Sequence, residues 1–302
     1  MRTVYLGTSG FAATVLRRLA DSPHRPLLVL TPPDRRRGRG RRELPPPAAL
    51  AAAELGLELC QSANVNQGEA LERVRAAAPE ALAVCAFGQL IREPLLSEFC
   101  LLNVHPSLLP RWRGAAPIER AIMARDERTG VCVMRLTAGL DSGPVALREE
   151  VTVGPEDDYG SLSATLAERG GELLVRALDE AAAGRLALAE QDEAAATYAE
   201  KIEPAERRLD LSRPAVELAA VVRALTPHIG AYLELAGGER LGVRRARPVA
   251  ADLAPGASRA EDGTILVGCE AGALALELVQ PAGGRPMAAA DFLRGHSLPE
   301  PA

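Results

Sequence analysis

The chain has 302 residues, which is enough for about two domains of ordinary size. Hydrophobic residues make up 47% and charged residues 25%, so the chain can bury a core and still present a solvated surface. The net charge of −5 excludes a protein that is basic all over. The longest apolar stretch, near 81–91, falls short of the ~20 residues of a membrane span. The first residues lack the apolar segment of a secretory signal, and we therefore expect a cytoplasmic protein.

The five cysteines and four histidines do not have the spacing of a metal or redox motif. No two cysteines approach CxxC spacing, and no histidines stand at HxxxH or HxxE. Most of the cysteines fall in apolar, strand-like runs, where cysteine behaves as a small buried hydrophobe. We therefore expect structural thiols and no metal ion. The cysteines are Cys60, Cys85, Cys100, Cys132 and Cys269.

The first two-thirds of the chain alternates short apolar runs with helical patterns, which predicts an α/β fold. Because the runs are almost wholly apolar, they fit a doubly wound, mostly parallel sheet that is buried on both faces, as in Rossmann-like domains. The expected strands are Val4–Leu6, Leu27–Leu30, Ala81–Phe87, Cys100–Val104 and Val131–Leu136. The expected helices are Phe11–Leu19, an Ala-rich segment after Pro45–Pro47, Gly68–Ala77, Ala116–Ala124 and Tyr159–Ala183.

The last third of the chain has a different periodicity. A polar stretch predicts a linker over 188–206, between a catalytic domain of 1–187 and a smaller domain of 207–302. In the smaller domain, Ala215–Leu225 is expected to be a helix. Tyr232–Leu235 and Leu241–Val243 flank a Gly-Gly turn, which predicts a β-hairpin. With further strands at Thr264–Val267 and Ala273–Val279, this pattern predicts a small, OB-like β-barrel.

The sixteen-residue segment Asn103–Ile118 carries the clearest chemical signal. It begins at the end of a buried strand, where open α/β sheets bind their ligands. Residues two apart on a strand face the same way, so Asn103 and His105 are expected to point together. An amide can donate to a developing oxyanion, and an imidazole can move a proton at neutral pH. Taken singly, each residue also has a structural interpretation, as a strand-end cap or a hydrogen-bonded histidine.

A carboxylate that could orient the His105 ring lies in the loop Ala138–Pro144. This loop follows the strand expected at Val131–Leu136, so it also lies at a strand end. Glycines flank the carboxylate residue, Asp141, which is poorly explained by packing. A turn aspartate is the simpler interpretation of Asp141 alone, because loops use Asp often.

The segment Arg35–Arg42 has six arginines in eight residues of an acidic protein. Like charges repel, so such a run is expected to remain a solvated loop. The residues alone leave three functions open: a merely solvated loop, nonspecific binding of polyanions, or a nucleic-acid contact. A second basic run, Val243–Arg247, is either a basic stripe or a solvated edge strand.

The Asn103–Ile118 segment resembles the hallmark of the folate-dependent formyltransferases, which is Asn-x-His, then Ser-Leu-Leu-Pro, with a later Asp. Within that family, Leu108–Ile118 is similar to the branch that formylates methionyl-tRNA. The similarity extends along the whole chain. Thr31–Asp34 with Gly38–Gly40 resembles the acceptor-stem loop of that branch, Thr197–Ile202 its interdomain linker, and Gln280–Gly283 with Met287 and Asp291–Leu293 its closing strand and tail.

The resemblance implies transfer of the formyl group of 10-formyltetrahydrofolate, as a co-substrate, to the amino group of methionyl-initiator tRNA. Asn103 and His105 would stabilise the oxyanion of the tetrahedral intermediate, and His105 would also move protons. Asp141 would orient His105 and help to accept a proton from the amine. We expect a monomer that uses no metal ion and binds no membrane.

The resemblance also implies two binding surfaces. The folate pocket would be lined by Phe87, Gly88, Gln89, Leu90, Ser107, Leu108, Leu109 and Pro110. The tRNA would be contacted by Arg36, Arg37, Arg39, Arg41 and Arg42, with Arg39 in the position of the family's discriminating arginine. For Phe87, an ordinary core position is an equally good interpretation.

Three other functions fit part of the sequence. A sugar-nucleotide N-formyltransferase can share the catalytic groups and a barrel-like second domain, but it would not need six arginines in one loop. A glycinamide-ribonucleotide formyltransferase shares His-Pro-Ser-Leu-Leu-Pro but is normally a single, shorter domain. A catalytically silent RNA-binding protein could retain the fold, although the complete Asn, His and Asp set argues against it. Departures from the family pattern at Ser9-Gly10, Phe87, Pro106 and Thr226–Gly230 concern folate affinity more than reaction type.

Overall fold

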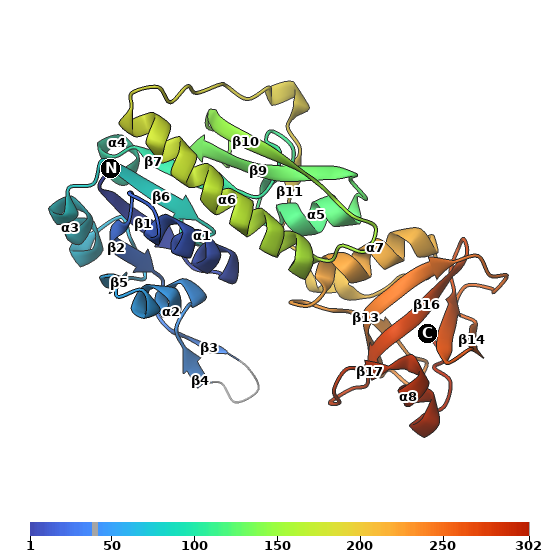
Figure 1. Cartoon of the computed structure of the whole chain (residues 1–302). Coiled ribbons are helices and arrows are strands. Elements are labelled where there is room, and N and C mark those ends of the chain that lie inside the picture. Colours follow the sequence, from blue (N-terminus) through green and yellow to red (C-terminus); the bar gives the residue numbers. More distant parts are fainter. Residues whose placement is uncertain (38–41, 302) are drawn as a thin grey trace. The chain divides into compact units, whose positions relative to one another are not determined.

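The computed structural model describes residues 1–37 and 42–301 (Figure 1). The chain divides into two compact units, each of which is assembled from three segments of the sequence. The first unit contains Met1–Gly114, Arg128–Thr152 and Ser163–Ala199. The second contains Ala115–Glu127, Val153–Leu162 and Glu200–Ala302. The residues predicted as a linker are therefore divided between the units after Ala199, and the predicted domain boundaries stay a prediction.

A seven-stranded mixed sheet forms the centre of the first unit, with the strand order β10-β9-β7-β6-β1-β2-β5. The five strands from β7 to β5 are parallel to one another; β9 runs antiparallel to β7, and the edge strand β10 runs antiparallel to β9. This confirms the mostly parallel α/β sheet. The strands are β1 (Thr3–Gly7), β2 (Pro26–Thr31), β5 (Leu59–Gln61), β6 (Ala81–Cys85), β7 (Leu101–His105), β9 (Arg128–Arg135) and β10 (Val145–Thr152).

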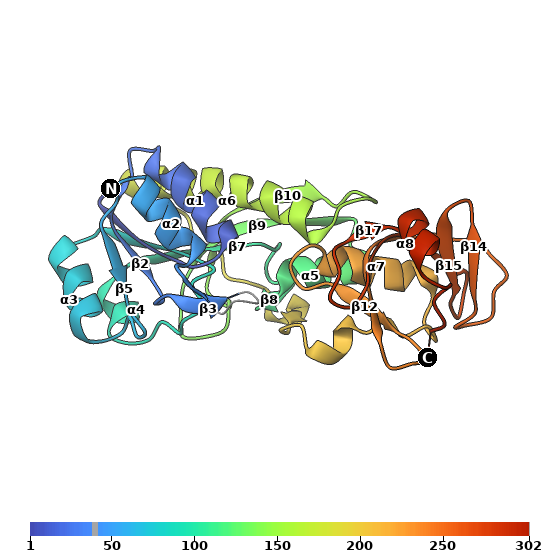
Figure 2. The same ribbon diagram turned by 90° about the horizontal axis from the view of Figure 1, so that it is seen from below.

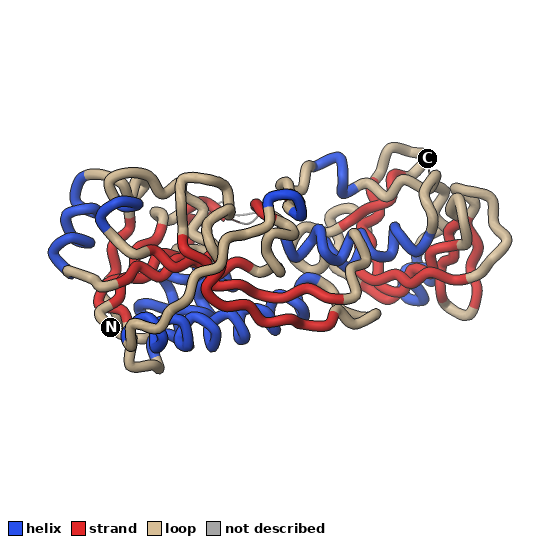
Figure 3. Tube along the Cα trace, turned by 90° about the horizontal axis from the view of Figure 1, so that it is seen from above, coloured by secondary structure: helices blue, strands red, loops and turns tan. Residues whose placement is uncertain are grey.

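Helices cover both faces of this sheet. Figure 2 shows α1 and α6 on one face and α3 and α4 on the other, and Figure 3 shows the same layers with the strands between them. The α1 helix begins after Ser9, whose side chain accepts a hydrogen bond from the Ala12 N–H and so caps the first turn. The helices are α1 (Gly10–Ala20), α2 (Pro47–Glu54), α3 (Gly68–Ala77), α4 (Leu95–Glu98) and α6 (Tyr159–Ala182).

An antiparallel sheet forms the second unit, with the order β12-β13-β16-β15-β14 and with β17 paired to β16. The predicted hairpin is confirmed, since β12 pairs antiparallel with β13 across the Gly-Gly turn. The helix α7 (Ala215–Leu225) packs against this sheet and against α5 (Pro117–Met123). The remaining elements are β12 (Ala231–Glu234), β13 (Arg240–Val249), β14 (Ser258–Glu261), β15 (Thr264–Gly268), β16 (Ala273–Gln280), β17 (Met287–Ala288) and α8 (Ala289–Gly295).

The segment Thr226–Gly230, which departs from the family pattern, is integrated into the second unit by its histidine. The His228 ring stacks on Tyr159, with ring centroids 3.6 Å apart. His228 Nε2 lies 2.9 Å from a carboxylate oxygen of Glu119, which is buried on α5. A stacked, hydrogen-bonded imidazole thus ties the segment after α7 to two other segments of the same unit.

The structure corrects the sequence prediction in three places. The strand expected to reach Phe87 ends at Cys85, because Ala86 adopts a left-handed backbone with φ 42°. The strand β10 was missed because its alternating charged residues are typical of a sheet edge, where one face is solvated. The basic loop was expected to be irregular, but its ends pair as the antiparallel strands β3 (Arg35–Arg37) and β4 (Arg42–Leu44).

The parallel strands are buried on both faces, as their apolar runs predicted. Every residue of β1, β6 and β7 is buried. Four of the five cysteines are buried and Cys100 is partly exposed, and none of them forms a disulfide. Among the described residues, no helix has the length and apolar character needed to cross a membrane.

Adjacent leucines on β2 provide a test of this packing. Leu28 is 2% exposed and Leu27 is 46% exposed. We expect Leu28→Ala to reduce the free energy of unfolding by about 2–5 kcal/mol, because it removes buried methyl groups and leaves a cavity. The matched change Leu27→Ala is expected to cost less than about 1 kcal/mol. Urea unfolding followed by circular dichroism measures both, and equal costs for the two variants would contradict the assigned burial.

Candidate active site

Two of the predicted catalytic side chains lie at the carboxyl end of β7. Asn103 and His105 are 8% and 4% exposed, and strand alternation places them on the same face of the sheet. In register, Asn103 lies between Val84 of β6 and Met134 of β9. Among the described residues the Asn103 side chain has no hydrogen-bond partner. Its amide atoms keep access to solvent, so its donors are available to another molecule.

The His105 ring is oriented from both of its nitrogens. Nε2 lies 2.9 Å from the carbonyl oxygen of Trp112. Because a carbonyl oxygen only accepts, Nε2 carries a proton and donates it to that bond. Nδ1 lies 3.6 Å from Oδ2 of Asp141, within ion-pair distance but longer than a hydrogen bond. Nδ1 is therefore the ring atom that can exchange a proton with Asp141.

Asp141 joins the two loops that follow β7 and β9. Its Oδ2 accepts a hydrogen bond of 2.9 Å from the Gly114 N–H and also faces His105. Its side chain is 15% exposed, and its backbone adopts the left-handed conformation with φ 45°. Such a backbone is unfavourable for a residue with a Cβ and persists only where the surroundings impose it. The structure therefore brings Asp141 and His105 together as the sequence predicted.

A segment predicted only as a linker is attached to this site. The strand β11 (Tyr198–Ala199) pairs in parallel with β8 (Arg113–Gly114). The Thr197 hydroxyl accepts a bond of 2.9 Å from the Trp112 N–H, and the Thr197 carbonyl accepts one of 2.9 Å from the Arg113 N–H. Gly114 has φ 118°, and a Cβ built on it would lie 2.8 Å from the Ala199 oxygen, so this pairing requires glycine. Sequence reasoning missed these contacts because they join residues about 85 positions apart.

The residues predicted to bind folate fall into two groups. In the first, Phe87 is 4% exposed and Leu90 is 63% exposed, so only Leu90 presents a large apolar side chain to solvent. Gln89 donates 2.6 Å to the Ser62 carbonyl and accepts 3.2 Å from the Val65 N–H, which fixes this loop to the segment after β5. Its side-chain amide is thus used in holding the loop.

The second group follows His105. The buried hydroxyl of Ser107 donates 2.6 Å to the Arg111 carbonyl and closes the turn. Leu109 is 2% exposed and packs with Cys132 and Met134 of β9. Leu108 and Pro110 are partly exposed. Ser107 and Leu109 therefore shape the loop, and their side chains are not on its surface.

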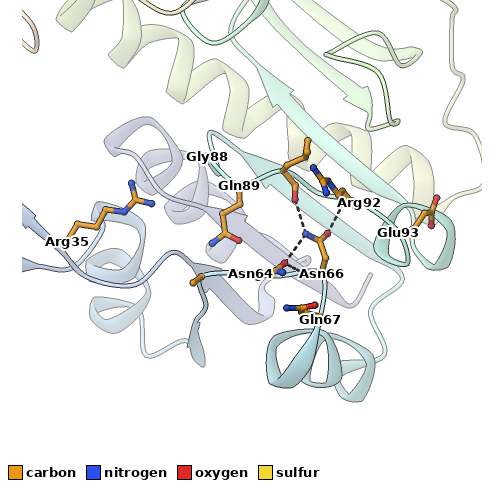
Figure 4. A pocket seen from close by; sticks show the side chains of 10 residues that line it. Arg35, Asn64, Asn66, Gln67, Gly88, Gln89, Arg92 and Glu93 are labelled. Atoms are coloured by element: carbon orange, nitrogen blue, oxygen red, sulfur yellow. Dashed lines mark hydrogen bonds between the residues drawn. The ribbon is translucent and has the colours of Figure 1, made fainter.

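A polar pocket of about 540 Å³ lies beside the Gly88–Leu90 loop (Figure 4). Across it, Asn66 donates 2.9 Å to the Leu90 carbonyl and accepts 2.7 Å from the Arg92 N–H. Asn103, His105 and Asp141 do not line it, so this pocket is separate from the three predicted catalytic residues. Its lining residues are Arg35, Ala63, Asn64, Asn66, Gln67, Gly88, Gln89, Leu90, Arg92 and Glu93.

The basic segment forms an antiparallel hairpin at its base. Arg36 is paired in register with Glu43, and Arg36 Nε lies 3.7 Å from Glu43 Oε1, with both side chains about two-thirds exposed. Such an exposed pair contributes little and leaves the guanidinium available. Arg39 and Arg41 lie outside the described residues, and the side chains of Arg37 and Arg42 are not described.

The second basic run lies on β13, which pairs with both β12 and β16 and is therefore not an edge strand. Arg244 donates to Gln280 at 3.0 and 2.6 Å. Arg245 and Arg247 both pair with Glu277 of β16, at 2.9 and 3.1 Å. Because one carboxylate faces two guanidinium groups, a net positive charge remains on this face.

The cysteines beside the site are not nucleophiles. Cys85 and Cys132 lie on β6 and β9, the two neighbours of β7. Burial raises the pKa of the Cys85 thiol to about 12 and that of Cys132 to about 11. Both therefore stay protonated at neutral pH, whereas nucleophilic catalysis needs a thiolate. Within residues 1–37 and 42–301, no cluster of His, Cys, Asp and Glu side chains could hold a metal ion.

Comparison with known proteins identifies the family. Residues 1–178 match the family described as "Formyl transferase", and residues 201–297 match "Formyl transferase, C-terminal domain". The chain therefore belongs to the formyltransferase family.

Its relatives match it over the whole length. Methionyl-tRNA formyltransferase of Parvibaculum lavamentivorans is 42% identical and is aligned over 99% of this chain and 98% of the relative. The protein of the same name from Methylococcus capsulatus is 43% identical, over 99% and 98%. The fold is also that of HypX from Aquifex aeolicus in complex with tetrahydrofolic acid, at a TM-score of 0.67 and 18% identity. The match covers 97% of this chain and 47% of HypX.

Proposed function

We propose that this formyltransferase moves the formyl group of 10-formyltetrahydrofolate to the amino group of methionyl-initiator tRNA, producing formylmethionyl-tRNA for translation initiation. Relatives of that activity match the chain from end to end at 42% and 43% identity. The observation that carries the proposal is the unpaired amide of Asn103 beside an imidazole that faces a carboxylate. An amide donor and an imidazole–carboxylate pair are the groups needed for an acyl transfer in which a neutral amine attacks a formyl carbon.

In the reaction, the amine nitrogen forms a bond to the formyl carbon and the carbonyl oxygen becomes an oxyanion. The unpaired Asn103 amide donates to that oxygen, which binds the transition state more strongly than the substrate. His105 stands two residues further along the same face, but its Nε2 donates to the Trp112 carbonyl and its Nδ1 faces Asp141, so its part in the reaction is proton transfer. The amine must lose a proton, and the Nδ1–Oδ2 pair of His105 and Asp141 accepts it. Collapse of the intermediate breaks the bond to N10 of the folate, and N10 takes up a proton.

The folate binds in the proposal along the loops that follow β6 and β7. Leu90 offers an exposed apolar side chain there, and the backbone of Gly88 and Gln89 offers polar groups. Leu108 and Pro110 contribute from the second loop. Ser107, Leu109 and Phe87 are assigned to holding these loops in shape, because their side chains are buried.

The tRNA contacts the β3–β4 hairpin, whose six arginines bring positive charge to an acidic protein. The arginines of β13 add contacts to the backbone of the nucleic acid. We further propose that the protein acts as a cytoplasmic monomer, with a catalytic domain of 1–187, a linker of 188–206 and a C-terminal domain of 207–302. It needs no metal ion in this mechanism.

A panel of acceptors tests the function. Purified protein is supplied with 10-formyltetrahydrofolate and, in parallel, methionyl-initiator tRNA, free methionine, glycinamide ribonucleotide and an amino-sugar nucleotide. We expect formylation of the methionyl-tRNA alone, measured as radiolabelled product that survives mild base hydrolysis as formylmethionine. Preferential formylation of the amino sugar would assign the chain to the sugar-nucleotide branch. Formylation of none of them would reject the proposal.

Substitution of the catalytic groups tests the mechanism. Asn103→Ala is expected to lower kcat by about 10²–10³-fold, the scale for one oxyanion donor. His105→Ala is expected to lower kcat by about 10²–10⁴-fold, the scale for a general acid or base. Rapid-quench assays at saturating substrates measure both. The matched control is His296→Ala, since His296 is exposed and remote in sequence from the site, and it should change kcat less than about twofold. Near-normal turnover by folded His105→Ala would remove His105 from the reaction.

Salt dependence tests the basic hairpin. The triple change Arg36→Ala, Arg37→Ala and Arg39→Ala should raise KM for the tRNA and flatten the log–log dependence of affinity on salt. Each phosphate contact that is lost should change the slope by about 0.7–0.9. The measurement is fluorescence anisotropy of labelled methionyl-initiator tRNA between low and moderate potassium chloride.

A second triple variant separates local contact from net charge. Arg169→Ala, Arg176→Ala and Arg185→Ala remove the same charge from exposed positions on and after α6. The slope for this control should stay close to that of the wild type. Equal flattening by the two triple variants would mean that the hairpin has no direct contact with the tRNA.

A further inference from the structure

The loop that carries Asp141 is held by a side chain from a distant segment. Gln191 Nε2 donates to the carbonyl oxygens of Asp141 and Gly143, at 2.8 and 2.7 Å. Gln191 Oε1 accepts 3.0 Å from Arg113 Nε. Both donors and one acceptor position of this amide are therefore used, and the side chain bridges the loop after β9 to the loop after β7.

The partner on the other loop is itself fixed. Arg113 is 1% exposed, although arginine is seldom fully buried unless it is paired. Its two terminal nitrogens donate to Glu193 at 2.9 and 2.8 Å, which is the bidentate geometry that arginine favours. The Arg113 guanidinium also holds the pKa of Glu193 below its usual value, so this pair stays ionised at neutral pH. Gln191 is thus anchored to a buried guanidinium that stays charged at neutral pH.

The far end of the held loop packs against β9. Gly143 is buried, and a Cβ built on it would lie 2.0 Å from the Arg135 oxygen, so the two backbones lie too close for any residue but glycine. The Arg135 N–H donates 2.9 Å to the Pro144 carbonyl, so this backbone bond and the two bonds from Gln191 hold the segment 141–144. The left-handed φ of Asp141 is unfavourable for an aspartate, and the two bonds from Gln191 act on the loop that contains it.

We infer that Gln191, anchored by Arg113, is a positioning residue for the formyl transfer, which sets the direction of the Asp141 carboxylate toward His105. The inference rests on the proposed function, since it assigns Asp141 a part in that reaction. The separation of Nδ1 and Oδ2 is 3.6 Å, slightly longer than a hydrogen bond, so a small shift of the Asp141 backbone decides whether the pair can close to the distance of proton exchange. Gln191 touches no reacting atom and acts through the Asp141 backbone.

The segment that carries Gln191 is also held to the sheet by bonds that do not involve the Gln191 side chain. Ala189 and Val145 exchange two backbone hydrogen bonds, of 2.8 and 2.9 Å. On the other side, Thr197 bonds to the 110–113 loop and β11 pairs with β8. Because these anchors flank Gln191, its substitution acts on the loop geometry and not on docking of the whole segment.

The test is Gln191→Glu, which keeps the size of the side chain and the contact with Arg113. Its second carboxylate oxygen faces the two carbonyl oxygens and cannot donate to them, so it repels the loop. We expect kcat to fall by about 10–100-fold. KM for both substrates should change less than about twofold, because the lost interaction serves the transition state. Glu190→Gln, an exposed change of one charge at the neighbouring position, is the control and should leave kcat and KM unchanged.

A double-mutant cycle separates positioning from a general loss of structure. In an Asp141→Asn background, adding Gln191→Glu should lower kcat by less than about threefold, because the group it positions is already disabled. Equal losses in both backgrounds would overturn the inference and assign Gln191 a purely structural role. Wild-type kcat retained by Gln191→Glu would also overturn it.

Two further results keep the outcome interpretable. Circular dichroism and the urea midpoint establish whether each variant is folded. If Gln191→Glu does not fold, Gln191→Met takes its place, because methionine has a similar volume and makes no hydrogen bonds here. If the wild type does not formylate methionyl-tRNA, the proposed function is rejected, whereas loss of the Gln191 effect alone rejects only the positioning role of Gln191. The two failures are therefore distinguishable.

Discussion

The carboxylate of Asp141 is the interaction on which the site depends. It accepts a hydrogen bond from the Gly114 backbone and faces the His105 ring, so it joins the loops that follow two strands. Neither loop has regular secondary structure that would by itself place Asp141 next to His105. The arrangement requires a left-handed backbone at Asp141, a glycine at 114 to admit the Ala199 carbonyl, and side-chain bonds from Gln191. Each local feature is unfavourable or unremarkable alone and makes sense only in this junction.

A second feature is the position of the Asn103 amide. Asn103 is 8% exposed and lies in register between Val84 and Met134, and its side chain makes no hydrogen bond to another described residue. Its amide atoms keep access to solvent, so they are available to a ligand oxygen, and such a bond is strongest when that oxygen carries negative charge. The thiols of Cys85 and Cys132 on the flanking strands stay protonated and offer no competing nucleophile. In the proposed mechanism, the Asn103 amide is therefore the group on these three strands that meets the developing oxyanion.

Much of the fold could be predicted from the residues because its signals are local. The apolar runs of β1, β6 and β7 predict strands buried on both faces, and the observed burial of all their residues confirms this. The helices α3 and α7 have the bounds that their periodicity predicts. What was missed has weak or contrary local signals: β10 carries alternating charges at a sheet edge, and the ends of the basic segment pair despite their mutual repulsion. In each case pairing with a neighbouring strand outweighs the local preference.

The sequence by itself determined the fold class, the order of the elements, and the presence of Asn103 and His105 on one face of a strand end, because strand alternation is a property of neighbouring residues. It also supplied Asp141 as a candidate partner. Only the tertiary structure decided that Asp141 reaches His105, that Asn103 stays unpaired, and that Gln191, from a segment without periodicity, holds the loop. These features depend on contacts between residues far apart in the sequence: 27 positions for Gly114 and Asp141, and 50 positions for Asp141 and Gln191. Such contacts exist only when the sheet has brought its strand ends together.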